Sequence, residues 1–526
     1  MTFKVLITDP IAQEGIDILR GGATVDIRLG LPPGDLLAII GGYDALVVRS
    51  ETKVTAPVID AGQKLQVVGR AGVGVDNIDV DAATRRGIIV VNAPEGNTIS
   101  AAEHALALML ALARHIPQAH QQLQKGIWRR QEHVGVEVRG KVLGVVGLGR
   151  VGSELAKRAR GLEMKILVYD PYVSPDQASR LGADVVALED VLKRSDFISI
   201  HTPLIESTRN LIGDRELTLT KPSAYLINAA RGGIVNEAAL RKAVDEGRLA
   251  GAAVDVFTKE PATENPLFGS EKIIVTPHLG ASTAEAQTNV AVDTAEQVLA
   301  VLRGEPLKYA VNAPMVAPEA YAQIAPFVSV ASCLGRLLSQ LMTGQLEAVG
   351  IRYEGEIANY DTRPLKAALL SGVLEGITEE RVNVVSVDHV VAHRGLKVTE
   401  QRSVTCENYA SLLTAEVSTS LGKTLASATL MRREVHIVRL DDYWVDLVPC
   451  EGYFMFTDHL DRPGIIGAVG NILGQADINI SSMQVGRLQA RGRAMMILSL
   501  DEPVPEEQRR NLLAVPDIYG IKVVKL

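Results

Sequence analysis

A glycine-rich turn near the middle of the chain constrains the fold more than any other segment. Gly147-Leu148-Gly149-Arg150-Val151-Gly152 follows an apolar strand pattern over residues 141–146 and opens a helical pattern over 153–160. The glycines permit a tight turn and close backbone approach, and the helix N-terminus offers free N–H groups and its positive dipole end to a pyrophosphate. In this context the pattern predicts a dinucleotide-binding βαβ unit.

An acidic residue ends the next predicted strand. Asp170 lies 18 residues after Gly152. A carboxylate at this point accepts the ribose hydroxyls and repels a 2′-phosphate, so we predict NAD rather than NADP as the cofactor. A second glycine pair, Gly72-Val73-Gly74, lacks both the third glycine and the acidic partner, and we do not interpret it as a nucleotide site.

Short β-branched runs alternate with helical patterns in two successive series. The runs are 5–8, 45–49, 67–69 and 88–91 in the first series, and 142–146, 167–169, 197–200, 224–227, 252–254 and 273–275 in the second. This rhythm predicts two parallel sheets covered by helices. We expect one long helix over about 100–124 between the series, and another over roughly 283–303 that ends at Gly304.

The pattern changes after a proline-containing linker at 311–318. Residues 320–341 are predicted to be helical, the runs 382–387, 425–430 and 435–440 to be strands, and 451–526 to hold a final strand–helix–strand unit. At roughly 150 residues per domain, 526 residues indicate three or four domains. Several different modules fit this pattern better than a repeat does.

Charge and cysteine content exclude several classes of protein. Lys and Arg number 54 against 62 Asp and Glu, a net charge of -8, so no global field attracts nucleic acid or an anionic membrane. Cys333, Cys406 and Cys450 are far apart and indicate neither a disulfide framework nor a zinc or other metal site. With no signal-peptide pattern at the start, we expect a cytoplasmic protein.

Polar and ionisable residues follow the strands of the second series. They are His201 and Thr202, then Arg231, then Asp255 with Glu260, and finally His278. Because open α/β sheets bind ligands beyond the carboxyl ends of their strands, we expect these side chains to gather at one edge.

Oxidation of a hydroxy acid needs a base for the hydroxyl proton and a cation for the carboxylate. His278 suits the first task, Arg231 the second, and Glu260 could stabilise the imidazolium and fix its tautomer. A single histidine after a strand is more often structural, and Arg231 or Glu260 alone could form surface ion pairs. Spacing alone therefore leaves this interpretation open.

Four ordered segments carry a resemblance to a known family. They are Gly147 to Gly152, Asn228-Ala229-Ala230-Arg231-Gly232-Gly233-Ile234-Val235, Asp255-Val256-Phe257-Thr258-Lys259-Glu260-Pro261 and Pro277-His278-Leu279-Gly280-Ala281-Ser282-Thr283. Together they resemble the D-isomer-specific 2-hydroxyacid dehydrogenases, and the whole chain is similar to their long members. The resemblance implies oxidation of 3-phospho-D-glycerate to 3-phosphooxypyruvate, the entry to L-serine biosynthesis.

The resemblance also implies residue roles. Arg231 would grip the substrate carboxylate, while Glu260 and His278 would form the acid/base pair. The residues that would border NAD are Gly147, Gly149, Arg150, Val151, Gly152, Asp170, Thr202, Ala230, Asp255 and Gly280. The residues that would face the substrate are Arg49, Arg70, Asn97 and, from a partner subunit, Arg130. The alternative for each of these four is a solvated charge or turn residue.

The C-terminal segment resembles an ACT domain through Asp461-Arg462-Pro463-Gly464 and Asn479-Ile480. His459, Asp461 and Asn479 match positions that hold L-serine in regulated family members, which makes serine feedback a hypothesis. The alternative is a pairing domain that has lost its ligand. In the preceding stretch Arg432, Arg433, His436 and Arg439 could bind an anion, although a solvated face is the more ordinary interpretation.

The expected architecture is α/β: a Rossmann-type nucleotide domain inserted in a flavodoxin-like substrate domain, followed by an α+β intervening domain and a ferredoxin-like ACT domain. The expected boundaries are 1–98 and 284–311 for the substrate domain, 99–283 for the NAD domain, 318–448 for the intervening domain and 452–526 for the ACT domain. Trp128 and the apolar helix around 106–112 would ordinarily be core, but the family suggests a dimer interface there, and we expect a homotetramer.

Two other functions remain open from the sequence. The substrate could be another D-2-hydroxy acid, or the chain could be an NAD-sensing binding protein on the same fold. Arg49 and Arg70 favour a phosphorylated substrate, and the complete set of Arg231, Glu260 and His278 argues against a sensor, which needs no proton acceptor.

Overall fold

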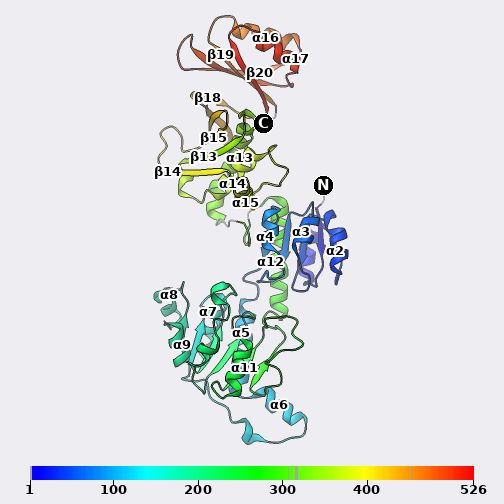
Figure 1. The fold of residues 1–526 in the computed structure, drawn as a ribbon, viewed down its shortest axis with the longest axis vertical. Coiled ribbons are helices and arrows are strands. Elements are labelled where there is room, and N and C mark those ends of the chain that lie inside the picture. Colours follow the sequence, from blue (N-terminus) through cyan, green and yellow to red (C-terminus); the bar gives the residue numbers. More distant parts are fainter. Residues whose placement is uncertain (1–2, 306, 314–317, 450–451) are drawn as a thin grey trace.

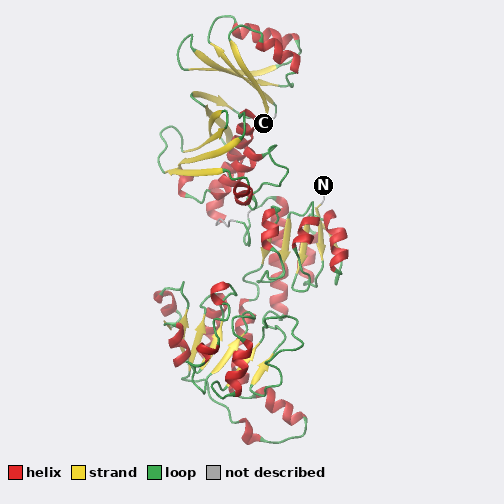
Figure 2. Cartoon of the chain, in the orientation of Figure 1, coloured by secondary structure: helices red, strands yellow, loops and turns green. Residues whose placement is uncertain are grey.

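The structure is a computed structural model that describes residues 3–305, 307–313, 318–449 and 452–526. Cys450 and part of the predicted linker, residues 314–317, lie outside the described residues. The described residues form four sheets. Figure 1 shows them in a row, with the sheet formed by residues 142–275 at one end and the C-terminal sheet at the other. The helices lie against the sheets within each module (Figure 2).

The first sheet is parallel and has the order β2-β1-β3-β4-β5, the flavodoxin-like order. Its strands are β1 (Phe3–Ile7), β2 (Ala23–Ile27), β3 (Ala45–Val48), β4 (Val67–Arg70) and β5 (Ile89–Asn92). The helices of this segment are α1 (Gln13–Arg20), α2 (Pro33–Ile39), η1 (Ile40–Gly42), α3 (Ala56–Ala61) and α4 (Val80–Arg85).

A distant helix completes this first module. α12 (Ala284–Arg303) begins at Thr283, whose hydroxyl caps the helix, and returns to pack on α1 and β4. Gly69 of β4 permits the close approach, because an added Cβ would lie 2.8 Å from the Thr294 side chain. The first module is therefore built from two separate parts of the chain, with its whole sheet in the first part and the covering helix α12 in the second.

The second sheet is parallel and has the order β12-β11-β10-β9-β6-β7-β8, the Rossmann order with one added strand. Its strands are β6 (Val142–Val146), β7 (Lys165–Tyr169), β8 (Ala183–Val185), β9 (Phe197–Ile200), β10 (Tyr225–Asn228), β11 (Gly251–Val254) and β12 (Ile273–Val275). The helices that follow its strands are α7 (Arg150–Gly161), α8 (Pro175–Arg180), α9 (Leu188–Arg194), η3 (Glu206–Thr208), α10 (Asp214–Leu217) and α11 (Glu237–Asp245).

The single helix expected over 100–124 is wrong. The structure divides it into α5 (Thr98–Ala113) and α6 (Ile116–Gln124), bent by 63°. His115 has a positive φ of 50°, and Pro117 in the first turn of α6 has no N–H to continue the ladder of α5. α6 and the following η2 (Arg130–His133) extend away from the second sheet (Figure 1).

The third sheet is mixed, with the order β14-β13-β15-β16-β17-β18. Its strands are β13 (Leu346–Gly355), β14 (Lys397–Ser403), β15 (Ser411–Thr419), β16 (Gly422–Met431), β17 (Glu434–Leu440) and β18 (Tyr443–Leu447). The accompanying helices are α13 (Pro318–Leu341), η4 (Glu356–Asn359), α14 (Arg363–Leu374) and α15 (Val387–His393). The strand expected at 382–387 is wrong, because this segment is a turn that leads into α15.

The fourth sheet is antiparallel, with the order β20-β21-β19-β22. Its elements follow the βαββαβ order of a ferredoxin-like fold. They are β19 (Tyr453–Leu460), α16 (Ile465–Gln475), β20 (Ile480–Arg487), β21 (Arg493–Leu500), α17 (Glu506–Leu513) and β22 (Ile518–Lys525).

One helix among the described residues is long and apolar enough to cross a membrane by length and composition alone. It is residues 320–341 of α13, and half of its apolar window is buried. The bent pair α5 and α6 would pass the same test only if taken as one span. α13 packs against α14 and β16, as the central helix of a folded module does.

Two side chains of the intervening module donate hydrogen bonds to the first module. Arg381 donates from Nη1 to the carbonyl oxygen of Leu65 at 2.6 Å, and Asn383 donates from Nδ2 to that of Gly87 at 2.7 Å. Both acceptors lie at the amino ends of strands, since Leu65 precedes β4 and Gly87 precedes β5. The C-terminal modules are thereby connected to the strands whose far ends hold Arg70 and Asn92.

The crossing of α13 and α14 gives a prediction on stability. A Cβ at Gly335 would overlap the carbonyl oxygen of Leu369, so Gly335→Ala must push the two helices apart. We expect the free energy of unfolding of this module to fall by about 1–3 kcal/mol. Calorimetric unfolding measures it, with Gly467→Ala in α16 as the control, because no atom lies within 4 Å of an added Cβ there. Equal effects of both substitutions would contradict the close helix contact.

Candidate active site

The glycine-rich turn adopts the geometry that a pyrophosphate requires. Gly147 has a φ of 95°, and a Cβ at Gly152 would overlap the carbonyl oxygen of Gly147, so α7 can start directly against β6. At Gly149 no atom lies within 4 Å of an added Cβ, which leaves the turn open for a ligand. The Oδ2 atom of Asp170 accepts the N–H of Leu148 at 2.8 Å, which ties the acidic residue to this turn.

A buried hydroxyl beside the turn tests whether the site fits a dinucleotide. Thr202 Oγ1 is buried and has no hydrogen-bond partner among the described residues. The side chain lies next to the turn, with Cγ2 2.9 Å from where a Cβ of Gly147 would be. Arg150 and Val151 form the first turn of α7, where free N–H groups face the same region. These features fit NAD.

The structure brings the side chains of His278 and Glu260 together. His278 Nδ1 and Glu260 Oε2 lie 2.7 Å apart, and Glu260 Oε1 accepts the N–H of Phe257 at 2.9 Å. Partial burial alone would raise the pKa of Glu260, but the hydrogen bonds from His278 and Phe257 lower it below its usual value. Glu260 is therefore ionised at neutral pH, and it leaves Nε2 of a half-exposed imidazole free for a substrate.

A buried carboxylate holds the turn that contains His278. Asp255 is fully buried, and its Oδ1 accepts the hydroxyl of Thr276 at 2.6 Å and the N–H of Leu279 at 2.8 Å. Its Oδ2 accepts the N–H of Gly280 at 2.9 Å. Burial alone would raise the pKa of Asp255, yet these bonds and one from His104, 3.2 Å away, lower it.

Three arginines from the two sheets gather beside this edge. Burial, then the proximity of Arg231 and Arg49, lower the pKa of Arg70 to about 10, and Arg70 Nε is buried without a hydrogen-bond partner among the described residues. Arg231 lies 3.4 Å from Asp76 and donates to the carbonyl oxygen of Ala230 at 2.7 Å. The arrangement suits a substrate with more than one anionic group.

The second glycine pair has a function that sequence reasoning missed. A Cβ at Gly72 would overlap the guanidinium of Arg70, and one at Gly74 would overlap that of Arg231. The pair therefore allows both arginines to approach the chain closely. The glycine pair is visible in the sequence, but a short glycine pattern does not show which side chains will pack against it. His104 was also missed, since a histidine inside an apolar helix gives no signal by spacing.

His201 proves to be structural. It hydrogen-bonds Ser199 Oγ at 2.8 Å, and desolvation of the imidazole lowers its pKa to about 4. His201 is therefore neutral at physiological pH, and its Nε2 is engaged by the hydroxyl of Ser199.

Two other residues, Asn97 and Arg130, were predicted to face the substrate. Asn97 immediately precedes α5, where the chain crosses from the first sheet to the second. Arg130 lies exposed in η2, on the extension formed with α6, and the single chain does not bring it to the arginine cluster. Trp128 on the same extension is 79% exposed, so the core alternative is wrong for it, whereas Leu108 and Leu112 of α5 are buried within the chain.

The predicted effector residues are divided between two ends of the fourth sheet. His459 is buried near the end of β19, and Asp461 follows it with Oδ2 2.9 Å from Arg487 Nη1, a hydrogen bond that lowers the pKa of Asp461. Asn479 precedes β20 at the opposite end and donates from Nδ2 to Asp501 at 2.6 Å. One chain does not unite them, so a shared site requires a second copy.

The unpaired Thr202 hydroxyl gives a prediction. Thr202→Val keeps the shape and removes one neutral hydrogen-bonding group, so we expect NAD binding to weaken by about fivefold. Titration of NADH followed by fluorescence measures the dissociation constant. Thr218→Val, which alters an exposed hydroxyl bonded to the carbonyl oxygen of Arg215, is the control. Unchanged affinity in Thr202→Val would remove this hydroxyl from the cofactor site.

Three family models match successive parts of the chain. Residues 106–280 match the D-isomer specific 2-hydroxyacid dehydrogenase NAD binding domain, 323–441 the D-3-phosphoglycerate dehydrogenase intervening domain, and 454–517 the ACT domain. Among solved structures, a protein from Thermus thermophilus matches with a TM-score of 0.55 and 34% identity over 59% of this chain and 99% of its own. A glyoxylate reductase from Paecilomyes thermophila matches with a TM-score of 0.54 and 28% identity over 59% of this chain and 98% of its own.

Curated relatives match at full length. The D-3-phosphoglycerate dehydrogenase of Synechocystis sp. is 45% identical over 99% of this chain and 95% of its own length. Those of Archaeoglobus fulgidus and Bacillus subtilis are 42% and 41% identical, and both are covered completely. With the nucleotide turn, the intervening module and the C-terminal module all matched in order, this chain belongs to the D-3-phosphoglycerate dehydrogenase family, within the D-isomer specific 2-hydroxyacid dehydrogenases.

Proposed function

We propose that the protein oxidises 3-phospho-D-glycerate to 3-phosphooxypyruvate with NAD, the first step of L-serine biosynthesis. The observation that supports this most directly is the gathering of Arg49, Arg70 and Arg231 at the edge that also holds the Glu260–His278 pair. A substrate with a carboxylate at one end and a phosphate at the other needs two cationic regions around one proton acceptor.

The residue roles follow from these positions. Arg231 binds the substrate carboxylate, while Arg49 and Arg70, at the ends of β3 and β4, receive the phosphate. His278 accepts the hydroxyl proton at Nε2, and the ionised Glu260 holds Nδ1 and stabilises the imidazolium. NAD supplies the acceptor for the hydride that leaves the substrate carbon. Asp255 keeps the turn at 278–280 in place while the proton moves.

The proposed nucleotide site uses residues from several strand ends. Gly147, Gly149, Arg150, Val151 and Gly152 face the pyrophosphate, and Asp170 receives the ribose hydroxyls. Thr202, Ala230, Asp255 and Gly280 border the rest of the cofactor. Since the carboxyl ends of β6, β7, β9, β10 and β11 lie along one edge, a single extended ligand can contact all of them.

We also propose that the chain assembles as a cytoplasmic homotetramer with domains at 1–98 with 284–311, 99–283, 318–448 and 452–526. The α6 extension exposes apolar side chains, namely Ile116, Leu123, Ile127 and Trp128, which supports one interface. Arg130 of this extension would reach the substrate of a neighbouring subunit. β20 is an edge strand with Met483 and Val485 exposed, which supports a second interface. Sedimentation equilibrium tests the subunit number.

L-serine is the proposed feedback effector at the second interface. His459 and Asp461 from one chain and Asn479 from another would offer groups for an ammonium and a carboxylate. The separation of these residues within one chain supports a site that forms only on pairing. Isothermal titration with L-serine should show saturable heat, and its absence would leave a pairing domain without a ligand.

The proton acceptor gives a prediction on turnover. His278→Ala removes the base but leaves the glycine-rich turn unchanged, so kcat should fall at least about 100-fold while NAD affinity holds. Steady-state kinetics with 3-phosphoglycerate and a separate NADH titration measure the two effects. His393→Ala, at an exposed site at the end of α15, is the matched control. Retained turnover would assign the proton to another group.

The arginine cluster gives a prediction on specificity. Arg70→Gln removes a charged donor from the phosphate, so kcat/KM for 3-phosphoglycerate should fall about 10–100-fold. D-glycerate and D-lactate, which have no phosphate, should lose much less. Arg20→Gln, which alters an exposed arginine near Asp17, serves as the control. An equal loss for all three substrates would instead support a dehydrogenase for another D-2-hydroxy acid.

A further inference from the structure

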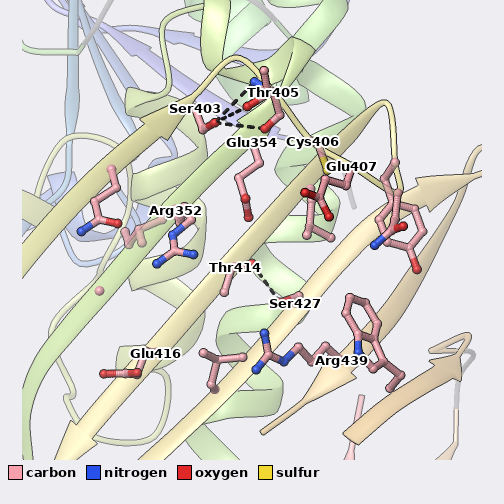
Figure 3. Close-up of a pocket in the computed structure, with 18 of the residues that line it drawn as sticks. Arg352, Glu354, Ser403, Thr405, Cys406, Glu407, Thr414, Glu416, Ser427 and Arg439 are labelled. Atoms are coloured by element: carbon pink, nitrogen blue, oxygen red, sulfur yellow. Dashed lines mark hydrogen bonds between the residues drawn. The ribbon is translucent and has the colours of Figure 1, made fainter. Parts of the chain in front are cut away.

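The third sheet has a hollow that the proposed reaction does not use. It measures about 500 Å³ and lies on the face opposite α13 and α14. Figure 3 shows the side chains that line it, with the loop at 403–409 along one side. Neither the nucleotide turn nor the effector residues of the fourth sheet contribute to it.

Strand register places one lining residue from every strand in a single row. Each residue is the direct partner of the next across the sheet, in the order Gln401, Arg352, Thr414, Ser427, Arg439 and Trp444. Neighbouring strands are about 4.8 Å apart, so the two arginines are anchored roughly 14 Å from each other. That spacing lets two long side chains reach toward one point between them.

Small residues create the hollow between these long ones. Thr414 and Ser427 occupy the two central positions of the row, and their hydroxyls lie 2.8 Å apart. Gly350 lies in the adjoining row, where an added Cβ would contact nothing nearer than Thr399 Oγ1 at 3.6 Å. The depression therefore follows from side-chain size at fixed positions of a regular sheet.

The hollow contains charges of both signs that are not paired with each other. Arg439 is held by the carbonyl oxygen of Asp441 at 2.8 Å and stacks on the ring of Trp444 at 5.9 Å. Arg352, Glu354 and Glu407 take part in no ion pair within the described part of the chain, whereas Glu416 is paired with Lys423 at 2.6 Å. In Figure 3 the side chains of Arg352 and Arg439 lie near Thr414 and Ser427, while Glu354 and Glu407 lie toward the loop.

This distribution of charges determines which ligands can pair all of their charged groups in the hollow. A simple anion would meet the two arginines but would also face the two glutamates, and a simple cation would face the arginines. A ligand with a carboxylate and an ammonium a few ångströms apart can satisfy both sets at once. The central hydroxyls can donate to the same carboxylate.

We propose that this hollow is a binding site for a free α-amino acid. Its carboxylate lies over Thr414 and Ser427 between Arg352 and Arg439, and its ammonium lies against Glu354 and Glu407. The site is separate from the effector site proposed on the fourth sheet. β18, which carries Trp444, contacts β20 of that sheet, and the N–H of Asp446 donates to Gln484 Oε1 at 2.9 Å.

The chain offers an internal reporter for this site. It has two tryptophans, Trp128 and Trp444, so Trp128→Phe leaves Trp444 as the single tryptophan fluorophore of the full-length protein. The probes are glycine, L-alanine and L-leucine, with acetate and methylamine as ligands that carry only one of the two charges. We expect a saturable change in fluorescence with at least one amino acid at a dissociation constant below about 1 mM, and none with acetate or methylamine in that range.

Substitutions of lining residues test whether the fluorescence change comes from binding in the hollow. Arg352→Gln should weaken binding by about tenfold or more, as loss of a charged donor does. Thr414→Val conserves side-chain volume and should weaken amino-acid binding by a smaller factor. This second variant keeps the proposal testable if Arg352→Gln fails to fold. Arg394→Gln, at an exposed position directly after α15 in the same module, should bind as the parent does.

Three results would overturn the proposal. One is a fluorescence that does not saturate with any of the three amino acids. Another is acetate binding as tightly as the amino acids, which would make the hollow a plain anion site. The third is an amino-acid signal that Arg352→Gln and Thr414→Val leave unchanged, which would place the ligand on the fourth sheet.

Discussion

The buried carboxylate of Asp255 is the interaction on which the catalytic edge depends. It accepts hydrogen bonds from the backbone of Leu279 and Gly280 and from Thr276, and His104 reaches it from α5. His278 lies within this turn at a positive φ of 56°, a conformation that a non-glycine residue adopts only when its surroundings impose it. Glu260 then fixes the imidazole from the other side. Asp255 thus holds the backbone of the turn, and Glu260 orients the imidazole of His278, the proposed proton acceptor.

The first module is built from two separate parts of the chain, and this arrangement brings cationic side chains to that edge. α12 returns from the second sheet and packs on β4, where Thr294 donates its hydroxyl to the carbonyl oxygen of Arg70 at 3.1 Å. A helix that closely follows His278 along the chain thus supports the strand end that holds Arg70. The glycines at 72 and 74 let the arginines from both sheets share one space. The nucleotide turn lies far into the chain because the sheet of the first module precedes it, and the helix α12 that covers this sheet follows it.

The sequence predicted those features that depend on local pattern. The glycine-rich turn, Asp170 and the Glu260–His278 pair all follow strands, and strand ends of a parallel sheet converge whatever the details of packing. The bend after Ala113 was missed because an apolar helix pattern continues through it, and only Pro117 marks the break. The strand predicted at 382–387 is a β-branched run that instead forms a turn leading into α15, since propensity is overridden by tertiary contacts. The row from Gln401 to Trp444 depends on the register of six strands, and no single segment contains that information.

In the proposed function, the arginine cluster lets an acidic protein bind an acidic substrate at some cost to its own stability. The net charge of -8 gives no long-range attraction for a phosphorylated acid, so binding relies on local donors. Burial and the adjacent arginines lower the pKa of Arg70 to about 10, which is still well above neutral, so Arg70 remains charged in the folded and unfolded chains. A lowered pKa means that the charged form is disfavoured by folding, and this loss is present throughout the pH range below 10. An anion that binds only the folded state offsets the repulsion, and the proposed substrate would therefore stabilise the same arginines that are proposed to bind it.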